Sequence, residues 1–467
     1  LDITLAATTR DDATTSTAQK AGYDIDLSLK AEQATIDAAI TVAGPHIRSQ
    51  KTGVHAAFVS LAPMLDRLLL SHDIRVSRGA QISLSVQDFS IDLSKLTASS
   101  RRDLRGLQGQ LLVSIGNTSG TLRPLGHDAI QDYELENFSF SASTDDLAQS
   151  LTIISDASFL ANNKPLASLH SNMVLSDLLD AAGSPRTSSL PTLSGQIKLS
   201  DVATDTLDTL LGDRLEDSGI VLARDVGSPA QLTLIVEPAD AAAPKKPNER
   251  GLISMLAAPV NINLTFRARN LDITAPLTLW ADRLWSRDTI TIVDRAAGQT
   301  LSTRMASRMS AVEQDNSVSP DSAPEKNNIE PEPSMRVTVA PVGSARLTIA
   351  NLELPLIKGA SVPLDAITAS STLTLEGMRV LIEPNGLRAG QPVQTVDIAS
   401  LVATLDTKPG QAPRVRADGR FIQADQPFAL ALNSTLHGLF GKTARSAADD
   451  SLAGASSSMG LNFASLR

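Results

Sequence analysis

Hydrophobic and polar residues alternate along most of this chain, and one eight-residue form of the alternation recurs. It reads apolar-polar-apolar, then a polar or small residue, then Asp, Asn or Gly, then apolar-polar-apolar. Alternation with a period of two is typical of a β-strand with one buried face. The clear copies are LSVQDFSI (Leu84–Ile91), YELENFSF (Tyr133–Phe140), FRARNLDI (Phe266–Ile273), LTIANLEL (Leu347–Leu354) and LTLEGMRV (Leu373–Val380), with IKLSDVAT (Ile197–Thr204) as a looser copy.

The middle of each copy interrupts the alternation. Such an interruption would move the following apolar side chains to the opposite face of the strand. A bulged residue moves them back, and Asp, Asn and Gly tolerate the positive φ that some bulges require. We therefore expect a mostly β fold: an elongated antiparallel sheet or groove with repeated bulged strands and a few short amphipathic helices. The expected bulge positions are Asp88, Asn137, Asn270, Asn351 and Gly377.

Leucines at helical spacing predict short amphipathic helices between some of these strands. Two of them share the motif LDxLL and lie within Leu61–Leu70 and Ala203–Gly212. Each is followed, after a loop, by an alternating strand that begins with Ala-Gln, at Ala80–Val86 and Ala230–Val236. This shared order indicates an internal duplication, although the unequal loop lengths disfavour a solenoid of fixed period. A further short helix is expected at Val174–Ala181.

Two segments poor in large apolar residues predict linkers, because they cannot bury enough surface to become ordered. Just before the second linker, Leu301–Val312 has the spacing of an amphipathic helix, which we interpret as packing on the sheet rather than lying in a membrane interface. The expected divisions are an N-terminal β-rich repeat region over 1–236 with both LDxLL helices, a short linker over 237–250, a β segment with an amphipathic helix over 251–309, a disordered linker over 310–335, a C-terminal β-rich repeat region over 336–440 and a flexible tail over 441–467.

Composition narrows the classes of partner. The chain is 42% apolar but only 3% aromatic, so Leu, Ile, Val and Ala must build its apolar faces. A net charge of −10 argues against nucleic acid or anionic lipid headgroups as surface partners. The absence of cysteine excludes disulfides, Cys-ligated zinc and thiol nucleophiles. No apolar stretch approaches the ~20 residues that a membrane-spanning helix requires.

The sequence contains no recognisable catalytic or metal-binding motif. Its six histidines have no metal-ligand spacing, and the paired aspartates lie in predicted loops or in the tail. The tripeptide Gly441–Thr443 matches the last three residues of a phosphate-binding loop motif, but Leu436 occupies the position where that motif requires its first glycine. We therefore expect a protein that is not an enzyme, with no catalytic residue, no metal and no cofactor.

Binding an acyl chain requires none of these motifs. Each methylene transferred from water to an apolar groove contributes about 0.8 kcal/mol, so a continuous lining of Leu, Ile and Val is sufficient. The alternative is that the same side chains form the closed cores of β-sandwiches, in a structural or adhesive envelope protein whose loops bind protein or polysaccharide. The candidate groove lining is Leu84, Val86, Phe89, Ile91, Leu135, Phe138, Phe266, Leu347, Ile349, Leu352 and Leu354.

The repeated units ISLSVQDFSIDL, ARLTIANLELPLI and LTLEGMRVLI, with the stretch Val415–Leu436, resemble the AsmA-like and TamB-like superfamily of bacterial envelope proteins. The resemblance implies a long β-groove that spans the periplasm of a Gram-negative-type bacterium and conducts phospholipids between membranes. It implies phospholipid or another acyl-chain lipid as partner, together with envelope proteins, and no nucleic acid. Members usually carry an N-terminal membrane helix, which this sequence does not contain. We therefore expect a periplasmic section of a longer membrane-anchored protein, with membrane contact only through segments outside this chain.

Overall fold

The structure is a computed structural model of the chain. It describes residues 2–10, 22–59, 74–78, 81–97, 103–122, 131–186, 191–211, 221–239, 259–280, 283–302, 335–356, 366–384, 393–409, 411–437 and 456–465.

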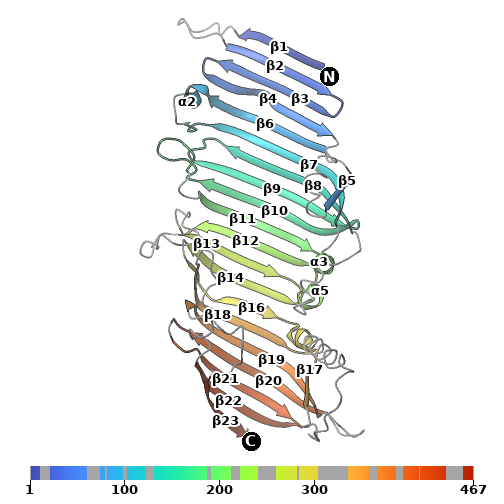
Figure 1. Cartoon of the computed structure of the whole chain (residues 1–467), viewed down its shortest axis with the longest axis vertical. Coiled ribbons are helices and arrows are strands. Elements are labelled where there is room, and N and C mark those ends of the chain that lie inside the picture. The colour runs from blue at the N-terminus through green and yellow to red at the C-terminus, as the bar shows by residue number, and fades with distance from the viewer. Residues whose placement is uncertain are drawn as a thin grey trace, which may run out of the picture.

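The described strands form a single antiparallel sheet of 23 strands, drawn out along one axis with the two ends of the chain at opposite ends (Figure 1). Each strand pairs with its neighbours in chain order almost throughout, so the sheet is a long meander. From β1 to β14 the order is β1 (Asp2–Arg10), β2 (Gly22–Ala31), β3 (Ala34–Ala43), β4 (His46–Val59), β6 (Gln81–Asp92), β7 (Gln108–Leu122), β8 (Gln131–Thr144), β9 (Ser150–Ala161), β10 (Lys164–Ser176), β11 (Thr192–Val202), β12 (Ala230–Pro238), β13 (Val260–Arg267) and β14 (Leu271–Trp280).

At three positions along the sheet, two strands share one place in the strand order. β5 (Ile74–Arg78) and β6 both pair with β7. β15 (Arg283–Ser286) and β16 (Ile290–Asp294) together join β14 to β18, and β17 (Met335–Val339) and β18 both pair with β19. The remaining strands follow in order as β18 (Ser344–Pro355), β19 (Thr368–Pro384), β20 (Gln394–Thr407), β21 (Arg414–Gln423), β22 (Gln426–His437) and β23 (Ser456–Ser465).

Bulges lie at several of the expected positions. Asp88 and Asn351 have φ of +49° and +53° and lie at register shifts, and Asp201 in the looser copy behaves in the same way at +56°. Gly377 also has a positive φ, of +64°. In β8 the register shift falls at Glu136, one residue before Asn137.

The expectation for Asn270 is wrong. Arg267 pairs with Asp272, so FRARNLDI contains the end of β13, a hairpin turn and the start of β14. Asn270 lies in that turn, where its Nδ2 donates to the Arg224 carbonyl (2.7 Å). Two short apolar alternations separated by two residues fit a bulged strand and a tight hairpin equally well, which explains the error.

The helices in the described part of the chain are short and lie at the ends of strands (Figure 1). They are α2 (Leu93–Thr97), α3 (Thr204–Leu211), α5 (Leu222–Asp225) and a helical turn over 297–302. α3 confirms the second LDxLL helix, whereas Leu61–Leu70 lies outside the described residues, as does all but the start of Leu301–Val312.

The helix expected at Val174–Ala181 is wrong. Strand β10 continues to Ser176, and a turn closed by a bridge between Leu179 and Pro185 follows it. The leucines in this segment have helical spacing, but pairing of β10 with both β9 and β11 decides its conformation.

The sheet continues across the expected division at 237–250, because Pro238 of β12 pairs with Val260 of β13. Strand β23 lies within the segment expected to be a flexible tail and pairs with β22. Most of the two expected linkers lies outside the described residues.

Candidate functional site

One face of the sheet is apolar along nearly its whole length, as the strand register shows. Residues directly opposite each other on antiparallel strands point to the same face. A first line of such residues crosses from β1 to β14 without a polar or charged side chain. It runs Leu5, Leu27, Ala38, Val54, Val86, Leu111, Ala142, Ile153, Met173, Gly195, Val236, Ile262 and Leu277.

A second line on the same face continues to β22. It shares strands β11 to β14 with the first line, since Leu232 and Val236 are four residues apart in β12 and residues two apart in a strand share a face. It runs Leu199, Leu232, Phe266, Ile273, Ile292, Leu347, Leu373, Ala403, Ala417 and Leu432. We call the face that carries both lines the apolar face.

The opposite face is polar and its side chains pair across strands. Ser28 Oγ donates to Asp37 (2.6 Å), and His170 Nδ1 lies 2.6 Å from Asp156 Oδ1. Thr278 Oγ1 similarly donates to Asn261 (2.8 Å). The sheet therefore separates a largely apolar side, on which Asp294 at the end of β16 opposes Leu271 and Ala345, from a side built of hydrogen-bonded polar residues.

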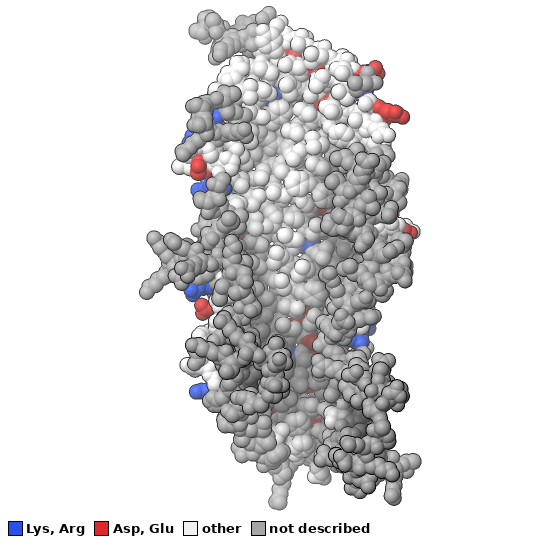
Figure 2. Space-filling view, in the orientation of Figure 1, with Lys and Arg blue, Asp and Glu red and all other residues white. Residues whose placement is uncertain are grey.

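The described residues place no second layer over the apolar face. All described strands belong to the one sheet, and none of the large side chains in the described part of the chain is less than 2% exposed. Figure 2 looks onto a broad side of the sheet, and in the upper half of the view the middle is mostly uncharged while charged residues lie mainly at the margins. The closed β-sandwich of the alternative hypothesis needs two facing sheets, which the described strands do not form.

The expected lining residues lie on the apolar face. Leu84 opposes Ala56 and Val113, and Phe138 opposes Ile115 and Ala157. Phe266 and Leu347 belong to the second line. The others on this face are Val86, Phe89, Ile91, Leu135, Ile349, Leu352 and Leu354.

The eight-residue repeat does not identify the whole lining. Leu111, Met173 and Val236 lie in strands that lack the repeat, and plain alternation such as LTLIV in β12 is their only signal. Met173, Val236 and Val260 form the most buried apolar cluster, at 8%, 5% and 7% exposed.

A cavity of about 420 Å³ lies on the apolar face where β4, β6, β7, β8 and β9 adjoin. No charged side chain lines it. Its lining is Val54, Val86, Phe89, Ile91, Leu107, Gln108, Gly109, Gln110, Leu111, Ala142, Thr144, Leu147 and Leu151.

Two loops at the strand ends border this cavity, and hydrogen bonds tie them together. We call residues 103–107 and 145–149 the rim clasp. The Leu147 amide donates to the Leu107 carbonyl (3.0 Å), and the Gly106 and Ala148 amides both donate to Asp146 Oδ1 (2.9 Å each). These two amides lower the pKa of the Asp146 carboxyl, because they stabilise its charged form.

A third loop supports the rim clasp from outside. The Leu104 amide donates to the Gly183 carbonyl (2.8 Å), and Arg105 forms an ion pair with Asp103 (2.7 Å). The hydrogen bond from Arg105 lowers the pKa of Asp103 to about 2. Lys95 of α2 donates to the Arg105 carbonyl (3.2 Å).

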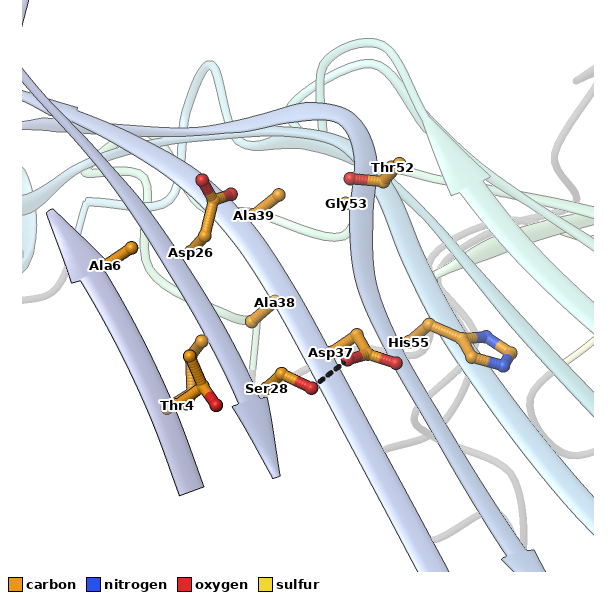
Figure 3. A pocket seen from close by; sticks show the side chains of 11 residues that line it. Thr4, Ala6, Asp26, Ser28, Asp37, Ala38, Ala39, Thr52, Gly53 and His55 are labelled. Atoms are coloured by element: carbon orange, nitrogen blue, oxygen red, sulfur yellow. Dashed lines mark hydrogen bonds between the residues drawn. The ribbon is translucent and has the colours of Figure 1, made fainter. Parts of the chain in front are cut away.

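A second cavity, of about 280 Å³, lies near the N-terminal end of the sheet (Figure 3). Small side chains such as Ala6 and Ala39 make room for it, and Asp26, Asp37 and His55 line it. Over the residues that the structure describes, no three His, Cys, Asp or Glu side chains are arranged to hold a metal ion. The hydrogen bond between Ser28 and Asp37, dashed in Figure 3, belongs to the cross-strand pairing of the polar face of the sheet.

No family model, curated protein or solved structure matches this chain. The helices in the described part of the chain are all too short or too polar to cross a lipid bilayer.

Proposed function

We propose that this chain is a non-enzymatic lipid-binding protein whose apolar face holds or conducts the acyl chains of phospholipids in bacterial envelope biogenesis. The observation that carries the proposal is the pair of overlapping lines of directly opposed apolar residues, which cross the sheet from β1 to β22 without a charge. Together with the sequence resemblance, it favours a periplasmic section of an AsmA-like protein.

The dimensions of the sheet suit a conduit. The 23 strands occupy 20 positions, since three positions are shared by two strands. At about 4.8 Å between neighbouring strands, 20 positions extend over roughly 90 Å. A lipid moving along the open stretches of such a face exchanges one set of aliphatic contacts for a similar set, so no single strand there traps it.

The energetics require no specific polar contact. Burying ten methylenes contributes about 8 kcal/mol at about 0.8 kcal/mol each. That gain is comparable to the stability of a whole domain. The absence of charge along both lines matters because an unpaired charge beside an acyl chain would lose hydration without compensation.

The test places a charge on the apolar face. Val86→Asp and Ile349→Asp alter this face in β6 and β18, while Ser85→Asp and Thr348→Asp place the same charge on the polar face of the same strands. The chain is exported to a bacterial periplasm, purified without detergent and examined by native mass spectrometry with lipid extraction. We expect phospholipid on the wild type and on the two polar-face variants, and loss of it from the two apolar-face variants with unchanged far-UV circular dichroism.

Two results would contradict the proposal. A wild-type protein free of lipid, with one sharp unfolding transition, would mean that the apolar face serves only stability. Unaltered lipid content in Val86→Asp and Ile349→Asp would place the lipid elsewhere on the molecule.

A further inference from the structure

One part of the apolar face has a side wall. The 420 Å³ cavity is lined on one side by strand residues such as Val86 and Leu111 and on the other by Leu107 and Leu147. Leu107 and Leu147 do not belong to strands: they lie in the loops before β7 and between β8 and β9. These two side chains convert an open face into a partly enclosed site.

From this arrangement we infer that the cavity is a discrete holding site for one hydrocarbon chain of a lipid, and that Asp146 positions the wall that encloses the chain. The inference rests on the proposed function and deepens it, because it assigns one place along the face where a chain is retained.

The chemistry of the lining selects a hydrocarbon over a peptide. The volume of the cavity lies within the range of small-ligand sites. The backbone of β6, β7 and β8 around it is paired within the sheet, at Val86 with Leu111 and at Leu111 with Ala142. Thr144 Oγ1 in the lining already donates to the Ser150 carbonyl (2.6 Å). A peptide would bring backbone polar groups for which this mostly aliphatic lining offers few partners, whereas a hydrocarbon chain needs none.

Asp146 is the group that holds the wall. Its Oδ1 accepts from Gly106 in one loop and from Ala148 in the other, on either side of the Leu147-to-Leu107 backbone bond. Removing the carboxylate leaves that single backbone bond between the loops, so Leu107 and Leu147 lose their fixed position over the cavity. Asp146 is therefore a positioning residue, and Asp145 beside it, which is exposed, provides a matched control.

The experiment locates the chain directly. The full chain is incubated with a diazirine analogue of palmitate, irradiated and digested, and the cross-linked peptides are quantified by mass spectrometry. Ala142→Phe fills the cavity, and Ala403→Phe makes the same change on the apolar face at β20, outside the cavity. Asp146→Ala opens the wall, and Asp145→Ala controls for loss of a neighbouring charge.

In the wild type we expect cross-links to concentrate in β6–β9 and in the rim clasp. Ala142→Phe and Asp146→Ala should each lower labelling there about tenfold, the ratio that corresponds to about 1.4 kcal/mol of binding free energy. Ala403→Phe and Asp145→Ala should leave it unchanged. Unchanged circular dichroism in Asp146→Ala, a loop variant, separates loss of the site from loss of the fold.

The remaining outcomes are distinct. Even labelling from β1 to β22 that Ala142→Phe lowers no more than Ala403→Phe would overturn the holding site and leave the proposed function standing. A wild type that labels nowhere on the apolar face would overturn both. Full labelling of β6–β9 in Asp146→Ala, with loss in Ala142→Phe, would overturn the role of Asp146.

Discussion

Strands β6 to β11 and strands β19 to β22 carry the same kind of apolar face but border it differently. In β6–β11, hydrogen bonds from the rim clasp and from Gly183 join loops that are far apart in the sequence. In β19–β22 the one fully described hairpin turn is short: Ala424 and Asp425, with φ of +47° and +62°, connect β21 to β22. Met173 in the first region is 8% exposed, whereas Leu405 in β20 of the second is 38% exposed. Met378, in β19 at the start of the second region, is buried at 3% exposed.

The difference shows that alternation alone makes an apolar face but does not decide how much of it water reaches. Burial of that face depends on what the strand ends contribute. We therefore expect side chains around Met173 in the first region to be closely packed and those of β20–β22 to be more open to water. Two pairs of substitutions and a change of pH test this contrast.

The largest effect should come from glycine. A Cβ on Gly195 in β11 would lie 2.1 Å from the Asn172 carbonyl oxygen, whereas a Cβ on Gly377 in β19 would meet nothing within 4 Å. Gly195→Ala should therefore lower the free energy of unfolding by roughly 3 kcal/mol, because the β10–β11 backbones must separate. Gly377→Ala should cost about 1 kcal/mol, the strain of a positive φ.

Chemical denaturation of both glycine variants measures this difference. Equal losses of stability would mean that β10–β11 yields as readily as β19, against the contrast drawn between the two regions.

Truncation of an apolar side chain should give an intermediate effect. Met173→Ala removes a member of the buried cluster and should cost about 2 to 3 kcal/mol, from lost burial and the space left behind. Leu405→Ala starts from a side chain 38% exposed and should cost about 1 kcal/mol or less. Urea unfolding in the absence of lipid reports both values, and a larger loss in Leu405→Ala would reverse the assignment of packed and open regions.

Acid should produce the smallest and most local effect. The pKa of Asp103 is lowered to about 2 and that of Asp146 is also lowered, so both carboxylates stabilise the rim clasp when ionised. This stabilisation is fully present above about pH 4, the ordinary carboxyl pKa, and is lost as the pH falls through the lowered values.

Hydrogen-exchange protection factors, measured between pH 5 and pH 2, follow this change. The Gly106 and Ala148 amides should lose protection at the acid end, because their acceptor becomes protonated. In β19–β20 the pKa of Asp397 is lowered by Arg379, a partner that is a side chain, so the backbone amides there should keep their protection. Unchanged protection at Gly106 and Ala148 once Asp146 is protonated would remove Asp146 from its role in the clasp.

The face pattern could be predicted from sequence because it is local. Residues two apart share a face, and Asp88 and Asn351 mark the bulges that return the following apolar side chains to the original face. Asn270 shows the limit of that reasoning, since its apolar flanks belong to two strands and only the pairing of Arg267 with Asp272 reveals it. The helix predicted at Val174–Ala181 was wrong for the same reason. Its leucines have helical spacing, but β10 pairs with β9 on one side and β11 on the other, and this pairing decides its conformation.

The wall of the cavity could not be predicted in this way. Leu107 and Leu147 lie in loops with no repeated pattern, and their positions depend on contacts such as Leu104 with Gly183, which are 79 residues apart in the sequence. From the sequence alone, Asp145 and Asp146 look like an ordinary pair of solvated turn residues. Only the fold shows that one of them accepts two backbone amides from separate loops.

The meander order gives the protein an adjustable length. Because strands pair with their neighbours in the chain, loss or gain of one hairpin, such as β9 with β10, leaves β8 and β11 antiparallel and able to pair. Each such change alters the span by about 10 Å, two strand spacings. The number of hairpins sets the length of the sheet, and side-chain alternation within each strand sets the apolar face. The length can therefore change in evolution without a change in the character of that face.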